Sequence, residues 1–200
     1  DVHVGSLAQL QTYHEWDYHP QGNPARPPAG LRALSDRVTR LVSEITEPRR
    51  HTHLAERVKR LHARGIAVAG SPPHLGGELF ESAWRLRGFE LFMKDLLKRP
   101  ELVEHLLDQL AAMAAESAEL LARAGVDVLL LDDDVAAGDG LLISPHLWRR
   151  FFKPRLARII EAGRRAAPDL LVFYHSDGDF TAILADLMEV GVNVVNPVAP

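Results

Sequence analysis

Four short apolar runs, separated by long amphipathic stretches, constrain the fold of this chain more than any other feature of its sequence. Runs of this length are typical of strands, and the run Leu170–Tyr174, apolar throughout, predicts a strand buried on both faces of a parallel sheet. Each run is followed by polar residues. The four runs are Ile66–Gly70, Val126–Leu131, Leu170–Tyr174 and Val192–Val195. Their alternation with helical stretches predicts an α/β fold with parallel strands.

Between the runs, apolar residues recur at the spacing of amphipathic helices, and Pro or Gly marks most of the ends. A proline inside a helix removes a hydrogen-bond donor and clashes with the preceding turn, so Pro154 predicts a bend. The expected helices are 31–45, 54–61, 78–98 with a break at Gly88, 100–124, 147–166 with the bend, and 180–190.

Strand–helix alternation fits both a (β/α)8 barrel and a doubly wound open sheet. No G-x-G-x-x-G or Walker-type loop follows any of the runs, which disfavours a nucleotide-binding open sheet. The last run leads into Asn196–Pro200 without a covering helix, and four strands alone would leave an exposed apolar edge. We therefore expect a partial TIM barrel: its first half in residues 61–200, and in 1–60 an N-terminal extension whose helices pack on the barrel.

The composition excludes several classes of function. The chain has no cysteine, so disulfides, a thiol nucleophile and thiolate metal ligands are excluded within these 200 residues. A net charge of −4 with dispersed signs gives no reason to expect nucleic acid or an anionic membrane as partner. The apolar runs are far shorter than the ~20 residues of a membrane-spanning helix. We expect a cytoplasmic protein.

The run Leu170–Tyr174 passes directly into His175, Ser176 and Asp177. In an extended chain the side chains of His175 and Asp177 point the same way, at the strand end where α/β proteins place ligands. One interpretation is a pair of metal ligands or an acid/base pair. The other is a histidine bonded to its own loop and an aspartate that caps the next helix.

Polar residues after the other runs are expected beside this pair, because parallel strands end on one face. Asp132–Asp134 follow the second run, and Ser71, His74 and Glu78 follow the first. Three crowded aspartates would raise a pKa or recruit a cation, whereas splayed into solvent they would form an ordinary loop. The candidates are Asp133, Asp134 and Glu81 for catalysis or further ligation, and His74, Arg87 and Asn196 for substrate binding.

Five collinear segments resemble the uroporphyrinogen decarboxylase family, and within it the branch close to corrinoid methyltransferases. The resemblance runs from about residue 60 to the end of the chain. It implies a (β/α)8 barrel with its site at the carboxyl ends of the strands. The segments are ELFESAWRLRGFELFMKDLLKRPELV (78–103), VDVLLLDDD (126–134), GLLISPHLWRRFFKPRLARII (140–160), FYHSDG (173–178) and GVNVVNPV (191–198).

The resemblance implies two alternative chemistries. True uroporphyrinogen decarboxylases use no metal or cofactor: an aspartate after the first barrel strand binds the pyrrole N–H groups, and N-terminal arginines hold the substrate carboxylates. The matching loop here, Ser71–His74, contains no aspartate, and residues 1–60 contain no R-Q-A-G-R motif. These departures favour the second chemistry, methyl transfer.

Corrinoid-linked methyltransferases of this family hold zinc on a His-x-Cys pair and a distant cysteine. His175 matches the histidine, and Asp177 stands where the first cysteine would be. Oxygen in place of sulfur makes the site harder and suits an alkoxide, phenolic ether or carboxylate substrate better than a thiol.

The first hypothesis is therefore an enzyme of this family that performs metal-assisted methyl transfer between a small methylated substrate and a corrinoid protein. His175 and Asp177 are the expected ligands of zinc or another divalent metal, and the enzyme is expected as a homodimer. The second hypothesis is a cofactor-free decarboxylase that forms coproporphyrinogen in porphyrin biosynthesis. The third, from another class, is a non-catalytic barrel that binds a ligand.

Overall fold

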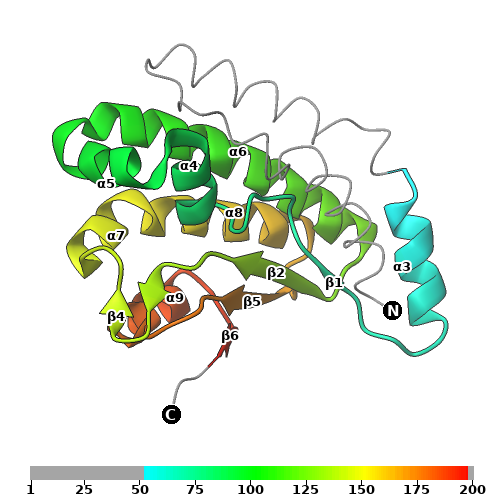
Figure 1. Cartoon of the computed structure of the whole chain (residues 1–200). Coiled ribbons are helices and arrows are strands. Elements are labelled where there is room, and N and C mark those ends of the chain that lie inside the picture. Colours follow the sequence, from blue (N-terminus) through cyan, green and yellow to red (C-terminus); the bar gives the residue numbers. More distant parts are fainter. Residues whose placement is uncertain (1–51, 198–200) are drawn as a thin grey trace, which may run out of the picture.

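A four-stranded parallel sheet forms the centre of the computed structural model, which describes residues 52–197 (Figure 1). The strands lie in the order β1-β2-β5-β6, the same order as in the sequence. A doubly wound sheet reverses its order at a switch point, so this order matches successive units of a β/α barrel. The strands are β1 (Ala69–Gly70), β2 (Val128–Asp132), β5 (Leu171–His175) and β6 (Val194–Asn196).

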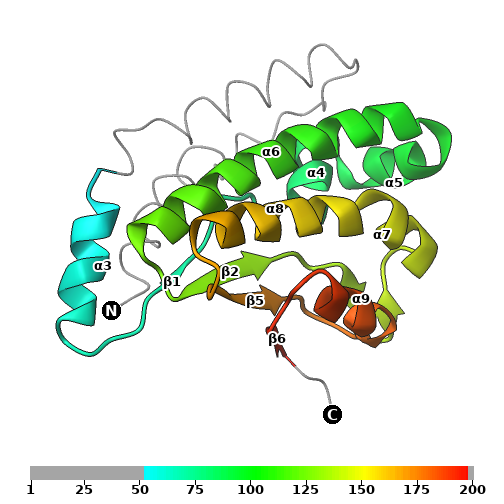
Figure 2. The same ribbon diagram turned by 180° about the vertical axis from the view of Figure 1, so that it is seen from behind.

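Helices connect each strand to the next. α6 and α8 lie side by side along one face of the sheet, in both views (Figures 1 and 2). The helices are α3 (Leu54–His62), α4 (Phe80–Arg87), α5 (Phe89–Lys98), α6 (Pro100–Ala124), α7 (Pro145–Phe151), α8 (Lys153–Ala166) and α9 (Leu184–Glu189), with a 3-10 turn at Thr181–Ile183 before α9. Among residues 52–197, none of them combines the length and hydropathy that crossing a bilayer requires.

One face of the sheet is buried and the other is partly open. Leu129, Leu131, Val172 and Tyr174 are at most 2% exposed, whereas Leu171, on the opposite face of β5, is 47% exposed. The expectation that this strand is buried on both faces is wrong for the part of the chain that the structure describes, because the helices cover only one face. This open face carries the last residue of each of the three longer strands.

Two expected helix boundaries are confirmed by glycines with positive φ. Gly88 (φ 89°) separates α4 from α5, and Gly125 (φ 91°) follows α6 in the left-handed conformation. Glycine adopts such angles without the steric penalty that a Cβ atom causes. These two helix boundaries are therefore encoded locally.

The expected single helix 147–166 is wrong: the chain forms α7 and α8, separated at Phe152. Ser144 caps α7, its Oγ accepting a hydrogen bond from Leu147 N at 3.3 Å. Pro154 lies in the first turn of α8, where its missing N–H has no partner to lose. The proline therefore starts a second helix instead of bending one.

Two further details differ from the sequence analysis. Residues after β2 form a short antiparallel hairpin, β3 (Ala136–Ala137) and β4 (Gly140–Leu141), which no apolar run predicted. The expected helix 180–190 is divided into the 3-10 turn Thr181–Ile183 and the shorter helix α9 (Leu184–Glu189). The expected helix 31–45 and nearly all of the 1–60 extension lie outside the residues that the structure describes.

Candidate functional site

The last residues of β2, β5 and β6 lie side by side on the open face of the sheet. Asp132 is in register with His175, and His175 with Asn196. Side chains at register positions share a face, so the three converge. His175 Nδ1 lies 2.8 Å from Asn196 Oδ1. With Nδ1–H donating to this amide oxygen, the Nε2 lone pair of the neutral imidazole is left for another ligand.

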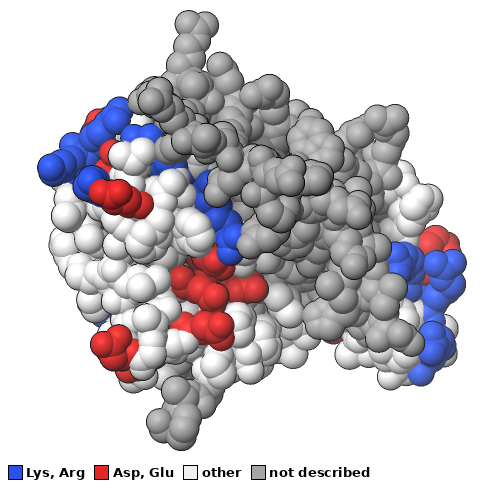
Figure 3. All heavy atoms as spheres, viewed as in Figure 1, with Lys and Arg blue, Asp and Glu red and all other residues white. Residues whose placement is uncertain are grey.

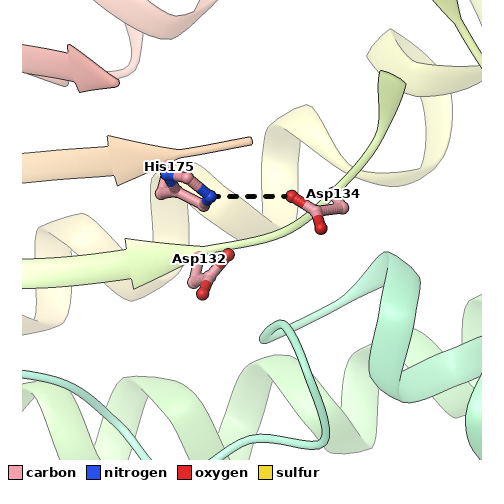
Figure 4. A group of neighbouring side chains, drawn as sticks. All are labelled: Asp132, Asp134 and His175. Carbon is pink, nitrogen blue, oxygen red and sulfur yellow. Dashed lines mark ion pairs between the residues drawn. The ribbon is translucent and has the colours of Figure 1, made fainter. Parts of the chain in front are cut away.

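That nitrogen lies close to two carboxylates. Asp132, Asp134 and His175 each offer a ligand atom, and these atoms all lie within 4.8 Å of one another. Figure 4 shows the imidazole and the Asp134 carboxylate facing each other, with Asp132 beside them; Nε2 to Asp134 Oδ1 is 3.9 Å. Nitrogen and oxygen ligands at such separations can close around a divalent cation.

Asp177, the expected second ligand, lies at the edge of this group. Its Oδ1 is 3.6 Å from His175 Nε2, but its side chain is 74% exposed. The strand ends at His175, so the alternation that predicted a shared direction does not continue to Asp177. Its backbone N–H instead donates to Asp134 Oδ1 at 2.6 Å.

Sequence reasoning had not selected Asp132 as a ligand, although it named the three successive aspartates. The missing information was the register of β2 against β5, which pairs Asp132 with His175. Burial, together with the negative charges of Asp134, Glu81 and Asp177, raises the pKa of the Asp132 carboxyl to about 6, although His175 acts in the opposite direction. A bound cation would relieve this repulsion.

Asp133, an expected catalytic residue, points to the buried side of the sheet. It is 4% exposed, and its carboxylate accepts hydrogen bonds from Phe80 N (2.8 Å) and Glu81 N (3.0 Å) at the start of α4. Burial raises the pKa of Asp133 to about 8. Its observed contacts are those of a helix cap.

Glu81 and Arg87, both on α4, occupy different environments. The Glu81 side chain is 9% exposed, pairs with Arg85 at 2.9 Å, and is near enough to Asp132 to influence its pKa. Arg87, expected to bind substrate, lies in the interior and pairs with Asp95 at 2.6 Å. The structure therefore brings Glu81, but not Arg87, toward the three-residue group.

Of the two remaining substrate-binding candidates, one lies in the strand-end group and the other does not. Asn196 contacts His175, as described above, and so belongs to the strand-end group. His74 is buried in the loop between β1 and α4, at 6% exposure. Neither position shows whether the residue contacts a substrate.

Glu78 had been noted after the first strand but given no role. It is 2% exposed, and it makes two hydrogen bonds to the backbone of Asp132: Glu78 N donates to Asp132 O (2.9 Å), and Asp132 N donates to Glu78 Oε2 (2.7 Å). Burial raises the pKa of Glu78 well above its usual value. Sequence reasoning had no means of detecting this contact, because it joins a loop residue to the end of a strand 54 residues further along the chain.

Acidic side chains gather in the middle of the face seen in Figure 1, as the space-filling view of Figure 3 shows. Basic side chains adjoin them on one side. The carboxyl end of the sheet is thus an acidic region that includes one imidazole.

Comparison with known proteins identifies the family of this chain. The model of the family "Uroporphyrinogen decarboxylase (URO-D)" matches residues 21–197. Two curated relatives, both the methylcobamide:CoM methyltransferase MtaA of Methanosarcina barkeri (one from strain Fusaro / DSM 804), are 33% identical over 100 residues, covering 50% of this chain and 27% of theirs.

A solved structure, a methyltransferase from Methanosarcina mazei, is similar over 71% of this chain and 40% of its own, with 26% identity and a TM-score of 0.56. The chain therefore spans well under half the length of these relatives. The family match covers most of the chain, and the order of the sheet agrees with it. This chain belongs to the uroporphyrinogen decarboxylase family and forms part of its (β/α)8 barrel.

Proposed function

We propose that this chain carries a divalent-metal site of an enzyme that transfers a methyl group between a small methylated substrate and a corrinoid protein. The observation that carries the proposal is the convergence of Asp132, Asp134 and His175 at the carboxyl end of the sheet. Relatives described as methylcobamide:CoM methyltransferases support the choice of reaction.

The donor set fits a divalent metal. It consists of one imidazole nitrogen and two carboxylates, and Asn196 holds the imidazole with Nε2 toward the carboxylates. Zinc accepts histidine and carboxylate ligands, and three protein ligands leave a position for substrate. Asp177 is a further ligand candidate on the exposed side, since its Oδ1 is 3.6 Å from the same nitrogen.

A metal held here would supply Lewis acidity to a substrate oxygen. Asp132 and Asp134 would bind it as carboxylates, and His175, oriented by Asn196, as a neutral imidazole. The chain offers no thiolate, since it contains no cysteine. Harder ligands favour oxygen-containing substrates, so we propose an alkoxide, phenolic ether or carboxylate compound over a thiol.

In this proposal residues 61–200 form the first half of the barrel and residues 1–60 an extension that packs on it. Glu81 is retained as a candidate for acid/base work because its charge acts on Asp132. Asp133 and Arg87 have mainly structural contacts, with α4 and with Asp95 respectively.

The test is zinc content and methyl transfer by the full-length protein. We expect stoichiometric zinc and zinc-dependent methylation of reduced cobalamin by oxygen-linked methyl donors, both lost in His175→Ala. His62→Ala is the matched control, because His62 also pairs with an aspartate, Asp127, but near the start of β2. Full methyl transfer without metal would reject the metal site.

Two other results would replace the proposed reaction. Metal-independent formation of coproporphyrinogen would identify a decarboxylase. Ligand-dependent stabilisation without any turnover would indicate a binding barrel.

A further inference from the structure

The end of β2, which carries Asp132, extends beyond its neighbour β1. β1 is only two residues long, and its last residue, Gly70, pairs with Leu129. On this side Asp132 therefore has no strand partner. On the other side, Asp133 N donates to His175 O at 3.0 Å, which fastens β2 to β5.

Glu78 takes the place of the missing strand partner. Its backbone N–H donates to Asp132 O and its Oε2 accepts from Asp132 N, so one residue satisfies both backbone groups of Asp132. Buried backbone groups need such partners, and a strand supplies them in the same paired way. Glu78 therefore holds the backbone of Asp132 itself, and β5 holds the next residue, Asp133.

The loop that carries Glu78 is itself held firmly against α4. Ser82 Oγ accepts a hydrogen bond from Leu75 N at 2.9 Å and donates one to Gly77 O. The loop also lies very close to β2: a Cβ atom on Gly77 would be 2.7 Å from Asp132 O. Glu78 thus reaches Asp132 from a well-supported position.

We infer that Glu78 is a positioning residue, which keeps the Asp132 carboxylate beside His175 by holding the Asp132 backbone. The inference rests on the metal site of the proposed function. Glu78 contacts none of the three ligand side chains in its described hydrogen bonds, so it acts through Asp132. The contact needs a side chain of glutamate length with an oxygen acceptor, and it needs no charge.

Three variants of Glu78 distinguish the effects of side-chain length and of the hydrogen-bond acceptor from the effect of charge. Glu78→Gln keeps the length and an acceptor oxygen, and Oε1, which has no hydrogen-bond partner among residues 52–197, can be replaced by an amide nitrogen without losing a contact. Glu78→Met keeps the length and removes the acceptor. Glu78→Asp keeps the carboxyl group but shortens the side chain by one methylene group, so that the acceptor no longer reaches Asp132 N. It replaces the methionine variant in the test if that variant fails to fold.

The measurement is zinc affinity of the full-length protein by chelator competition, together with crystal structures of the metal-free variants. We expect Glu78→Gln to bind zinc within about threefold of the wild type, and Glu78→Met and Glu78→Asp to bind it about 10- to 100-fold more weakly, as when a residue that supports a ligand is lost. In both weakened variants the Asp132 carboxylate should move away from His175 Nε2.

Asp186→Asn, a carboxylate-to-amide change in α9, is the control for a general loss of stability and should leave zinc affinity unchanged. Unaltered affinity in Glu78→Met and Glu78→Asp, or a loss in Glu78→Gln equal to theirs, overturns the positioning role while leaving the metal site intact. Wild-type protein that binds no zinc rejects the proposed function. In that case the inference stands only if the metal-free crystal structures show the displaced Asp132, and is overturned if they do not.

Discussion

Two groups of acidic side chains in this molecule differ in how their charge is balanced. Asp186, on α9, accepts hydrogen bonds from Arg149 Nε (2.9 Å) and Lys153 Nζ (2.8 Å), and these two bonds lower its pKa. Asp132, at the end of β2, faces Asp134 and one histidine, and burial raises its pKa to about 6. Arg149 and Lys153 neutralise the first carboxylate, whereas the second has no ion pair with a lysine or arginine within residues 52–197.

This is the difference expected between a carboxylate with a structural role, such as Asp186, and a carboxylate of a candidate cation site, such as Asp132. Arg149 and Lys153 belong to α7 and α8, so Asp186 ties the last helix to the two before it. A partly buried carboxylate without a cation costs stability, and perturbed carboxyl groups of this kind concentrate at functional sites. The strand-end group therefore has the electrostatics expected of a cation site.

The largest expected effect is on metal binding at Asp132. We expect Asp132→Asn to lower zinc affinity by more than about 100-fold, beyond the 10- to 100-fold loss typical of residues that only support a ligand. Because this substitution removes a poorly compensated negative charge, the metal-free variant should melt at or above the wild-type temperature. Chelator competition and calorimetry of the metal-free proteins measure the two quantities.

A clear fall in the melting temperature of metal-free Asp132→Asn would contradict the contrast drawn between the two acidic groups. It would mean that the Asp132 carboxylate stabilises the fold, as Asp186 does.

The next effect concerns Asn196, whose amide oxygen lies 2.8 Å from His175 Nδ1. We expect Asn196→Ala to weaken zinc binding by about tenfold, because the imidazole loses the partner that sets its orientation and tautomer. Asn196→Asp, which keeps an acceptor at the same place, should retain most of the affinity. Equal losses in both variants would show that orientation of the imidazole is not the role of Asn196.

The smallest effect is on stability at Asp186. We expect Asp186→Asn to lower the melting temperature by about 2–4 °C at neutral pH, the shift of roughly 1 kcal/mol in a chain of this size, without changing zinc affinity. Asp186 has a lowered pKa in the folded state. Its contribution is therefore present above the ordinary aspartate range and is lost as the pH falls through the folded pKa.

Unfolding free energies of the wild type and Asp186→Asn should accordingly converge as the pH is lowered through that range. A difference that stays constant down to the lowest pH would exclude the charge of Asp186 as its cause.

Much of the fold follows from local patterns. The apolar run at 126–131 and the glycine at 125 place β2 and the end of α6 to within two residues, because both signals depend on the chain's own periodicity and backbone preferences. Pro154 correctly indicated an interruption of the helix, but the predicted bend was wrong. A proline is compatible with both a bend and a helix start, and packing of α7 and α8 selects the helix start.

The sequence predicted that polar residues gather at the strand ends, but only in part which of them converge. His175 and Asp134 were expected there and belong to the group that could hold a metal ion. Arg87 was expected to meet substrate, but Asp95 pairs with it inside the protein, a contact that helical spacing alone does not reveal. Asp177, expected beside His175, has its Oδ1 3.6 Å from His175 Nε2, but it lies in an exposed position after the end of β5 and not on a continuation of the strand.

By itself the sequence determined that strands and helices alternate, that polar residues follow each strand, and that these 200 residues offer no thiolate to a metal. These properties depend on residue type and on spacing along the chain. Only the tertiary structure decided that two of the three aspartates, Asp132 and Asp134, lie close to His175, and that Glu78 holds the backbone of Asp132. Both depend on the register between strands and on contacts between residues more than 40 positions apart, which local spacing does not specify.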